Sequence, residues 1–248
     1  MQHLDDFFKE YNNVALAFSG GVDSAYLLYA AKNFGANITA YYVKTQFQPE
    51  FEYEDAMKLI EQIDVPVRVL ELDVLQYQDI KCNPNNRCYF CKKVLFNAII
   101  AAAKEDGYSI VIDGTNASDD VTDRPGMKAL EELKVLSPLR ICNLTKDRIR
   151  ELSKQAGLFT WNKPAYACLA TRVKQGEVIT AEVLKIIERA EAYLNSIGFS
   201  DVRVRESNGI AKIQIPKNQF GLFFTKHEEV RDEFTKWFDG VLFDLVGR

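Results

Sequence analysis

A glycine turn between an apolar run and a helical pattern is the feature that most constrains how this chain folds. The run from Val14 to Phe18 is apolar throughout, and Ser19-Gly20-Gly21-Val22-Asp23-Ser24 follows it directly. A helical pattern of apolar residues then continues to Ala31. A run that is apolar on both faces is typical of a buried parallel strand, and the glycines mark the turn into a helix. The sequence therefore predicts a strand–turn–helix unit.

The same alternation of strand and helix continues beyond this unit. We expect strands at 38–43, 67–72 and 110–113, and helices at 52–63 and after Cys91. Strands that alternate with helices at this spacing form parallel sheets. The fold class predicted is α/β, with an open parallel sheet that carries helices on both faces.

A different pattern occupies the rest of the chain. The elements expected there are a helix at 146–156, an irregular segment at 161–172, a helix at 180–195, strands at 202–205 and 211–215 around a turn at 207–209, and a helix at 228–238. Two antiparallel strands flanked by helices indicate a small α+β domain. We therefore expect two domains, residues 1–172 and residues 173–248.

Composition narrows the classes of protein to consider. The chain has 248 residues, 47% of them hydrophobic and 27% charged, which excludes disordered and collagen-like classes. Lys and Arg number 31 against 35 Asp and Glu, so no overall positive field attracts nucleic acid. The polar N-terminal residues do not resemble a targeting segment, and no apolar run is long enough to span a bilayer. We expect a cytoplasmic protein with reduced thiols and no membrane partner.

The glycine loop is a candidate site for phosphate. The unpaired backbone N–H groups and the dipole at a helix N-terminus favour an anion, and Gly20 and Gly21 let the backbone approach it closely. The hydroxyls of Ser19 and Ser24 add donors, and Asp23 is placed to hold Mg²⁺ against the phosphates. The loop is neither a Walker-type P-loop nor a dinucleotide fingerprint. The alternative is a glycine turn that serves only the chain's topology.

Three of the five cysteines are candidates for metal chemistry. Cys88 and Cys91 stand three residues apart near the expected start of a helix, on one face of it, where thiolates are favoured. Such a pair is consistent with half of a zinc site, a redox pair or part of an iron–sulfur site. The alternative is that both cysteines simply lie in the core. Cys168 lies in the irregular segment near Arg172, which favours a thiolate or a phosphate; the alternative is simple burial. Three thiolates can hold a [4Fe-4S] cluster with one open iron.

These motifs together resemble the LarE-type sulfur transferases of the PP-loop ATPase superfamily. The likeness extends over most of the chain. The matching segments are Ser19–Ser24, Asn86–Lys92, Asp113–Asn116 with Asp119, Asp120 and Asp123–Gly126, Ser137–Leu139, and Lys163–Arg172. Residues 1–172 would be the PP-loop ATP-binding domain and residues 173–248 an α+β domain for substrate binding or oligomerisation.

The resemblance implies a specific reaction. ATP adenylates a carboxylate of a pyridinium biscarboxylic acid mononucleotide, and sulfur then displaces AMP, a step in making the nickel-pincer nucleotide cofactor. Some members sacrifice the sulfur of the cysteine that matches Cys168, whereas others carry the pair that matches Cys88 and Cys91 and use sulfide on a [4Fe-4S] cluster. Because this chain has all three cysteines, we expect the cluster-dependent subtype, supplied by sulfide or a sulfur donor protein.

The resemblance and the predicted fold assign further residues. The expected catalytic residues are Asp23 and Cys168, and the expected metal ligands are Cys88, Cys91 and Cys168. Arg203 and Arg205 are expected to bind the substrate phosphate. The residues expected to bind the cofactor are Ser19, Gly20, Gly21, Asp23, Ser24, Asp113, Asn116 and Arg172. For the residues after Asp113 the alternative is helix capping and turn formation, and for the two strand arginines an ordinary exposed face. Gln214 departs from an acid that family members often have, and Glu191 is a further candidate. Cys82 and Cys142 are expected to be structural.

Three other functions compete with this one. A tRNA thiolation enzyme would use the same ATP chemistry and the same cluster, but it would need a basic surface or an added RNA-binding module. A regulatory module that binds nucleotide and metal without turnover would need a damaged loop. An ammonia-using ligase leaves the cysteines without a role. We expect a homo-oligomer that binds a small nucleotide substrate and no nucleic acid.

Overall fold

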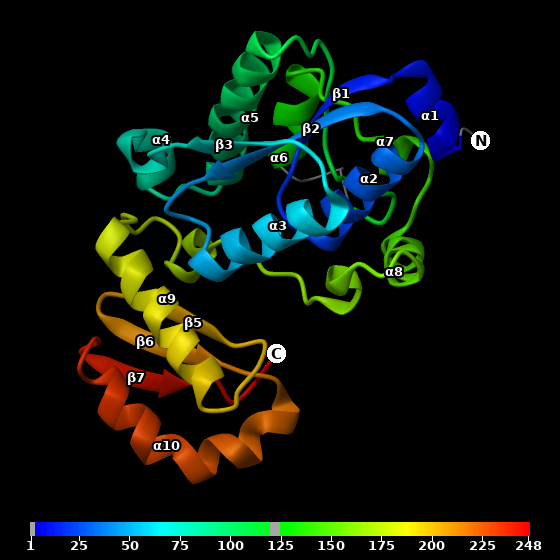
Figure 1. Ribbon diagram of the computed structural model, residues 1–248. Helices are drawn as coiled ribbons and strands as arrows, with labels where there is room; N and C mark the ends of the chain where they lie inside the picture. The colour runs from blue at the N-terminus through cyan, green and yellow to red at the C-terminus, as the bar shows by residue number, and fades with distance from the viewer. Residues whose placement is uncertain (1–2, 120–124) are drawn as a thin grey trace. The chain divides into compact units, whose positions relative to one another are not determined.

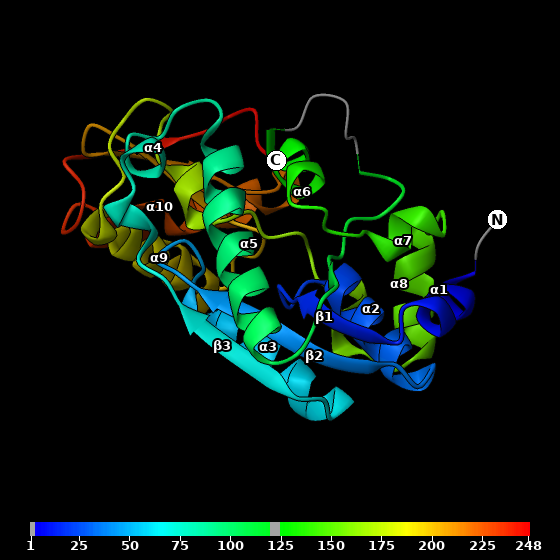
Figure 2. The ribbon, with the colours of Figure 1, turned by 90° about the horizontal axis from the view of Figure 1, so that it is seen from above.

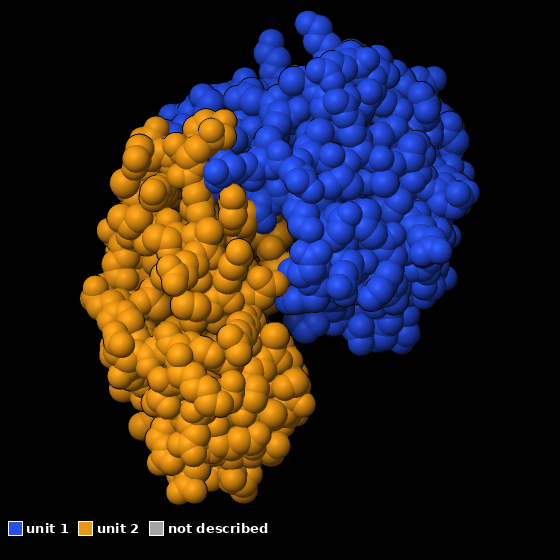
Figure 3. Space-filling model, turned by 60° about the vertical axis from the view of Figure 1, so that its left-hand side comes forward, with its two compact units in different colours: residues 1–45, 50–74, 86–165 blue, residues 46–49, 75–85, 166–248 orange. Residues whose placement is uncertain are grey.

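The computed structural model describes residues 3–119 and 125–248 (Figure 1). Contacts within the chain divide it into two compact units, coloured separately in Figure 3. Unit 1 comprises residues 1–45, 50–74 and 86–165, and unit 2 comprises residues 46–49, 75–85 and 166–248.

The change of unit at residue 165 precedes the expected boundary at residue 172. Residues 166–172 group with unit 2 because Tyr166 and Arg172 both bond to Glu191 in that unit. Separate functions for the expected domains 1–172 and 173–248 stay a prediction.

Unit 1 is built on a parallel sheet of four strands. The strands are β1 (Asn13–Ala17), β2 (Asn37–Lys44), β3 (Val67–Glu71) and β4 (Val111–Ile112), in the order β3-β2-β1-β4. Every pairing in this sheet is parallel, and β1 pairs with β2 on one side and with β4 on the other. The predicted α/β class with a parallel sheet is confirmed.

Helices cover both faces of this sheet because its inner strands are apolar on both faces. Leu16 of β1 packs in one core with α2 (Val22–Asn33) and α3 (Glu50–Ile63). Its neighbour Ala15 points to the other core, with α5 (Arg87–Glu105) and α6 (Pro125–Glu132). Figures 1 and 2 show α3 and α5 on opposite sides of the sheet. The remaining elements of unit 1 are α1 (Leu4–Glu10), α7 (Pro138–Ile141), α8 (Lys146–Gln155) and the 3-10 turn η2 (Phe159–Asn162).

Unit 2 holds a small mixed sheet packed against two helices. Its strands are β5 (Arg203–Ser207), β6 (Ile210–Gln214) and β7 (Gly240–Phe243); β5 and β6 are antiparallel, while β6 and β7 are parallel. The helices are α9 (Ala181–Ser196) and α10 (Phe220–Phe234), which share an apolar core with the sheet. Smaller elements are α4 (Gln78–Lys81) and the 3-10 turns η3 (Leu169–Arg172) and η4 (Lys217–Gln219), with η1 (Val74–Gln76) at the change of unit.

The structure corrects the starts of two expected helices and adds a strand to the second sheet. The expected helix after Cys91 begins at Arg87, so the cysteine pair lies inside its first turns. The final helix, which was expected from residue 228, begins at Phe220. Gly221 and Pro216 weaken the helical pattern in the sequence, but Phe223 packs into the apolar core and stabilises the earlier start. Strand β7 was not expected, since four residues are too few to show an alternating pattern.

The helices of residues 3–119 and 125–248 include none that combines the length and the apolar character needed to cross a membrane.

We predict that Gly20→Ala destabilises the fold far more than Gly35→Ala. Both glycines have a positive φ, +73° and +77°, so both substitutions incur about 1–2 kcal/mol of backbone strain. A Cβ at Gly20 would also lie 2.9 Å from the Cβ of Ala56, whereas one at Gly35 meets nothing within 4 Å. This overpacking adds about 1–3 kcal/mol to the loss at Gly20. Urea unfolding measures the free energy of unfolding of the two variants. Equal decreases in that free energy would contradict the close approach of the loop to α3.

Candidate active site

The glycine loop joins β1 to α2 and is tied together by its own serines. The two hydroxyl oxygens of Ser19 and Ser24 lie 3.1 Å apart, and the Ser24 hydroxyl donates to the carbonyl of Gly21 at 3.2 Å. Gly21 is the N-cap of α2 and supplies no side-chain cap, so the first N–H groups of this helix keep their capacity for an anion. This local geometry suits the binding of an anion such as phosphate.

The segment that follows β4 lies directly against this loop. A Cβ on Gly114 would lie only 3.0 Å from the backbone nitrogen of Ser24, so a side chain at this position would force the two segments apart. The approach follows from the sheet order, because β1 and β4 are parallel neighbours and their carboxyl ends share one edge. Ligands of open α/β sheets bind at this edge.

Asp23 is the charged centre of the loop. Its Oδ2 lies 2.5 Å from the Nζ of Lys146, and its Oδ1 accepts a hydrogen bond from the Nδ2 of Asn116 at 3.3 Å. Burial raises the pKa of the Asp23 carboxyl, an effect that the hydrogen bond and charge of Lys146 oppose. A half-buried carboxylate at a helix N-terminus, with an ammonium partner, is chemically suited to a divalent cation.

The residues after β4 brace the loop. Asp113 accepts from the Ser137 hydroxyl at 2.6 Å and from the Thr115 hydroxyl at 2.5 Å, so both of its oxygens are bonded within the protein. Asn116 accepts from the backbone N–H of Ser118 at 2.8 Å, which aims its amide nitrogen at Asp23. These contacts account for both residues as turn formers. Their expected contacts with the cofactor stay predictions, and Asp120, Asp123 and Arg124 lie outside the described residues.

Lys146 is a site residue that sequence reasoning missed. It is the first residue of α8, capped by Thr145, and appeared in the sequence only as the start of a helix. The available signal is electrostatic: a lysine at a helix N-terminus opposes the helix dipole, so it needs a nearby anion to stabilise it. That anion is Asp23, 123 positions away in the sequence.

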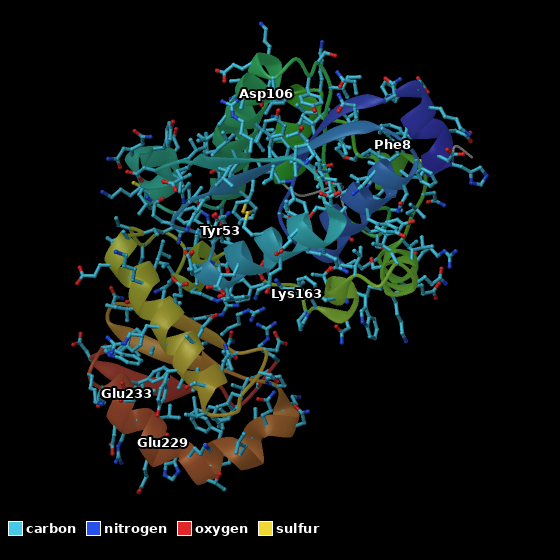
Figure 4. The ribbon with its side chains drawn as sticks, in the orientation of Figure 1. Phe8, Tyr53, Asp106, Lys163, Glu229 and Glu233 are labelled. Atoms are coloured by element: carbon cyan, nitrogen blue, oxygen red, sulfur yellow. The ribbon has the colours of Figure 1, made fainter. Side chains whose placement is uncertain are left out.

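Two charged side chains anchor the end of unit 1. Arg150 donates to the carbonyls of Trp161 at 2.7 Å and of Lys163 at 2.9 Å. Lys163, labelled in Figure 4, lies against α3, with its Nζ 3.0 Å from Glu52 and 2.9 Å from Asp55. The first part of the segment that the sequence predicted to be irregular is thereby held in place on unit 1.

The three cysteines expected to bind metal, Cys88, Cys91 and Cys168, are divided between the two units. Cys88 and Cys91 lie in the first turns of α5 in unit 1, where Cys88 is exposed and Cys91 half-buried. Cys168 caps the 3-10 turn η3 and belongs to unit 2. In neither unit, over residues 3–119 and 125–248, do three Cys, His, Asp or Glu side chains form a group that could hold a metal ion. Cys82 is exposed and Cys142 buried, and none of the five cysteines forms a disulfide.

A buried charge cluster lies beside Cys168 in unit 2. Arg172 is 2% exposed; its Nε donates to Glu191 at 2.6 Å, and Nη1 donates to the carbonyl of Ala167 at 3.2 Å. Glu191 also accepts from the hydroxyl of Tyr166 at 2.6 Å and from the backbone N–H of Val204 at 2.9 Å. Burial, followed by the charge of Glu191, raises the pKa of the Tyr166 phenol, which keeps it a hydrogen-bond donor. Arg172, Glu191 and Tyr166 thus fix the backbone around Cys168.

The two strand arginines lie on β5 next to this cluster. Arg203 is buried, with its guanidinium 4.8 Å from the ring centre of Tyr166, while the exposed Arg205 donates to Gln214 at 2.6 Å and to the carbonyl of Thr171 at 2.7 Å. Burial lowers the pKa of both guanidinium groups, and the positive charge of Arg172 lowers it further. Guanidinium groups are suited to an anion such as phosphate, although the carboxylates of Glu191, Asp201 and Asp244 offset part of the positive charge here. Gln214 donates to the carboxylate of Asp244 at 2.6 Å.

The chain is similar to several known proteins. Residues 13–83 match the family model described as "Queuosine biosynthesis protein QueC". The chain is 33% identical over 242 residues to the pyridinium-3,5-bisthiocarboxylic acid mononucleotide synthase of Lactiplantibacillus plantarum, covering 96% of this chain and 88% of that protein. It is 37% identical over 227 residues to the protein slr1717 of Synechocystis sp., described as uncharacterized, covering 90% and 84%. A tRNA-specific 2-thiouridylase of Clostridium botulinum is 29% identical over 182 residues, 60% of this chain and 52% of that protein.

We predict that Glu191→Gln strongly destabilises unit 2. The substitution leaves the Arg172 guanidinium buried without its counter-charge, which costs about 3–5 kcal/mol. The matched control is Glu151→Gln, which breaks the exposed pair with Arg148 and costs about 0–1 kcal/mol. Urea unfolding followed by tryptophan fluorescence measures the stability of both variants, and Trp237 reports on unit 2. Similar small decreases in the free energy of unfolding would contradict the central role of the buried pair.

Proposed function

The chain belongs to the LarE-like family of PP-loop ATP-dependent sulfur transferases, and on this premise we propose that it replaces oxygen by sulfur in a carboxylate of a pyridinium biscarboxylic acid mononucleotide. The observation that carries the proposal is the 33% identity over 88% of the pyridinium-3,5-bisthiocarboxylic acid mononucleotide synthase. The phosphate-loop geometry around Asp23 in unit 1 supports it independently, because this chemistry begins with ATP.

The reaction has two steps. A carboxylate is a poor electrophile until one oxygen becomes a good leaving group. A carboxylate oxygen of the substrate attacks the α-phosphorus of ATP, and the bond from that phosphorus to the bridging oxygen breaks to release pyrophosphate. A sulfur nucleophile then attacks the acyl carbon, and the bond to the AMP oxygen breaks to give a thiocarboxylate.

We assign the first step to residues of unit 1. The N–H groups of α2 and the hydroxyls of Ser19 and Ser24 would hold the pyrophosphate as its charge grows. Asp23, with the carboxylate donor chemistry that Mg²⁺ prefers, would hold the metal that neutralises the phosphates. Asn116 would orient Asp23 through its amide.

We assign the substrate phosphate to unit 2. Arg203 and Arg205 would bind it, since both lie on β5 close to Arg172, and their pKa values are lowered by burial and then by the charges of Arg172 and Arg248. Arg172 is bonded to Glu191 and to the carbonyl of Ala167, and we propose that it positions the residues around Cys168 as well as contacting the nucleotide.

For the sulfur source we propose the cluster-dependent route. Its support is the donor set: Cys88 and Cys91 are three positions apart in the first turns of one helix, and Cys168 lies at the start of η3, in the segment that Arg172 holds through the carbonyl of Ala167. These three would hold a [4Fe-4S] cluster, which when bound supplies sulfide at its open iron. Only two of these thiolates, Cys88 and Cys91, belong to unit 1. The alternative is that the Cys168 thiolate displaces AMP to form a thioester; loss of the Cα proton then breaks the Cβ–Sγ bond, which leaves the sulfur on the substrate as a thiocarboxylate and dehydroalanine at position 168.

Transfer of sulfur to tRNA is the second candidate function. The 29% identity to a tRNA-specific 2-thiouridylase favours it, but that likeness covers 52% of the relative, and the net charge of this chain is −4. Salt-sensitive binding of bulk tRNA would favour it, because phosphate contacts weaken steeply with salt.

We predict that Asp23→Ala and Cys168→Ala separate the two steps. Asp23→Ala should lower AMP formation about 10²- to 10³-fold, since the charge on the leaving pyrophosphate loses its metal partner. Cys168→Ala should keep AMP formation and abolish the thiocarboxylate product. Asp79→Ala and Cys82→Ala, at exposed positions outside the site, are matched controls. Chromatography of AMP and mass spectrometry of the product measure both steps; loss of AMP formation in a folded Cys168→Ala protein would contradict the division.

We predict that anaerobic reconstitution with iron and sulfide loads about four irons per chain. Cys88→Ala should lose the cluster and sulfur transfer while keeping adenylation, whereas Cys82→Ala should keep all three. Iron counting and Mössbauer spectra provide the measurement. A protein without iron whose Cys168 loses the mass of hydrogen sulfide during turnover would refute the cluster route and establish the sacrificial one.

A further inference from the structure

The ion pair between Asp23 and Lys146 occupies the carboxylate that we propose for Mg²⁺. We infer that Lys146 is an exchangeable counter-ion: its ammonium neutralises Asp23 in the nucleotide-free protein and moves to the phosphates when Mg²⁺ and ATP bind together. Lys146 thereby makes metal binding conditional on the nucleotide. The inference rests on the proposed role of Asp23.

The backbone of Lys146 is fixed, so the exchange needs only its side chain. Its N–H donates to the hydroxyl of Ser118 at 3.0 Å, and Thr145 caps the helix that begins here by accepting from the N–H of Arg148. The lysine side chain is a flexible four-carbon stem with a compact charge at its end, and it is 31% exposed. Its ammonium can therefore turn from one anion to another while α8 stays in place.

The other groups that face Asp23 do not replace Lys146. Arg150 adds positive charge, but its guanidinium is bonded to the carbonyls of Trp161 and Lys163. Asp119 adds negative charge, and Asn116 donates a neutral hydrogen bond. Lys146 provides the ammonium in direct contact with the carboxylate. Because Asp23 is partly buried, a nearby cation is needed to stabilise its negative charge.

Electrostatics then couples the two ligands. Without nucleotide, a divalent cation that binds to Asp23 must displace the Lys146 ammonium. The ammonium then lies close to the cation without an anion of its own, and the two positive charges repel each other. When ATP is present, the displaced ammonium binds to its phosphates. The N–H groups of the glycine loop bind the same phosphates. The wild-type site should therefore bind metal weakly without nucleotide and strongly with it, a coupling that is reciprocal between the two ligands.

The test is to measure Mn²⁺ binding by electron paramagnetic resonance and binding of a non-hydrolysable Mg²⁺–ATP analogue by calorimetry, at about pH 8 so that Asp23 is ionised. In Lys146→Met we expect Mn²⁺ alone to bind more tightly and the nucleotide to bind more weakly, with the coupling reduced about 5- to 150-fold. Lys154→Met is the matched control on the same helix, and Lys146→Arg, which keeps the charge, should bind Mn²⁺ alone as weakly as the wild type.

The outcomes separate the inference from the proposed function. Opposite changes in the two affinities support the exchange, whereas equal weakening of both or no change in either overturns it. If Asp23→Asn binds Mn²⁺ as the wild type does, the metal is not at Asp23 and the inference fails with that assignment. Since neither measurement uses the carboxylate substrate or sulfur, failure of the proposed sulfur transfer would leave the binding results unchanged.

Discussion

The parallel pairing of β1 with a strand on each side is the constraint on which unit 1 depends. Because β1 lies between β2 and β4, its carboxyl end delivers the glycine loop beside the segment that follows β4. The approach is so close that Gly114 has no room for a side chain against Ser24. The phosphate loop, the amide of Asn116 and the carboxylate of Asp23 meet because backbone hydrogen bonds hold the strands in this order.

Unit 2 depends instead on buried charge. Glu191 on α9 accepts from Arg172, Tyr166 and the N–H of Val204, so one carboxylate ties the segment around Cys168 to the helix and to β5. A buried ion pair adds little net stability but is costly to break, and its directional bonds specify one arrangement. These bonds hold Cys168 in a segment that consists mostly of turns.

What the sequence predicted correctly was local in the chain. The strand, the glycine turn and the helix around Asp23 are contiguous, so residue types and periodicity revealed them, and the alternation of elements predicted the parallel sheet. Lys146 was missed because its partner is 123 residues away, and a helix start carries no sign of what lies opposite it. Strand β7 was missed because its four residues become a strand only by pairing with β6. The positions of Cys88 and Cys91 near a helix start followed from local sequence, whereas Cys168 lies in the other unit, far along the chain.

The division of unit 2 into three stretches of sequence has a consequence for synthesis on the ribosome. Residues 46–49 and 75–85 emerge early, yet their partners come much later: the carbonyl of Phe47 accepts from the N–H of Leu169, and the amide of Asn83 donates to the carbonyl of Val173, 90 residues later. Domains usually fold from the N-terminus as they emerge. Here the parallel sheet can form first, but these two early stretches of unit 2 wait for their partners until residues 169–173 have been translated.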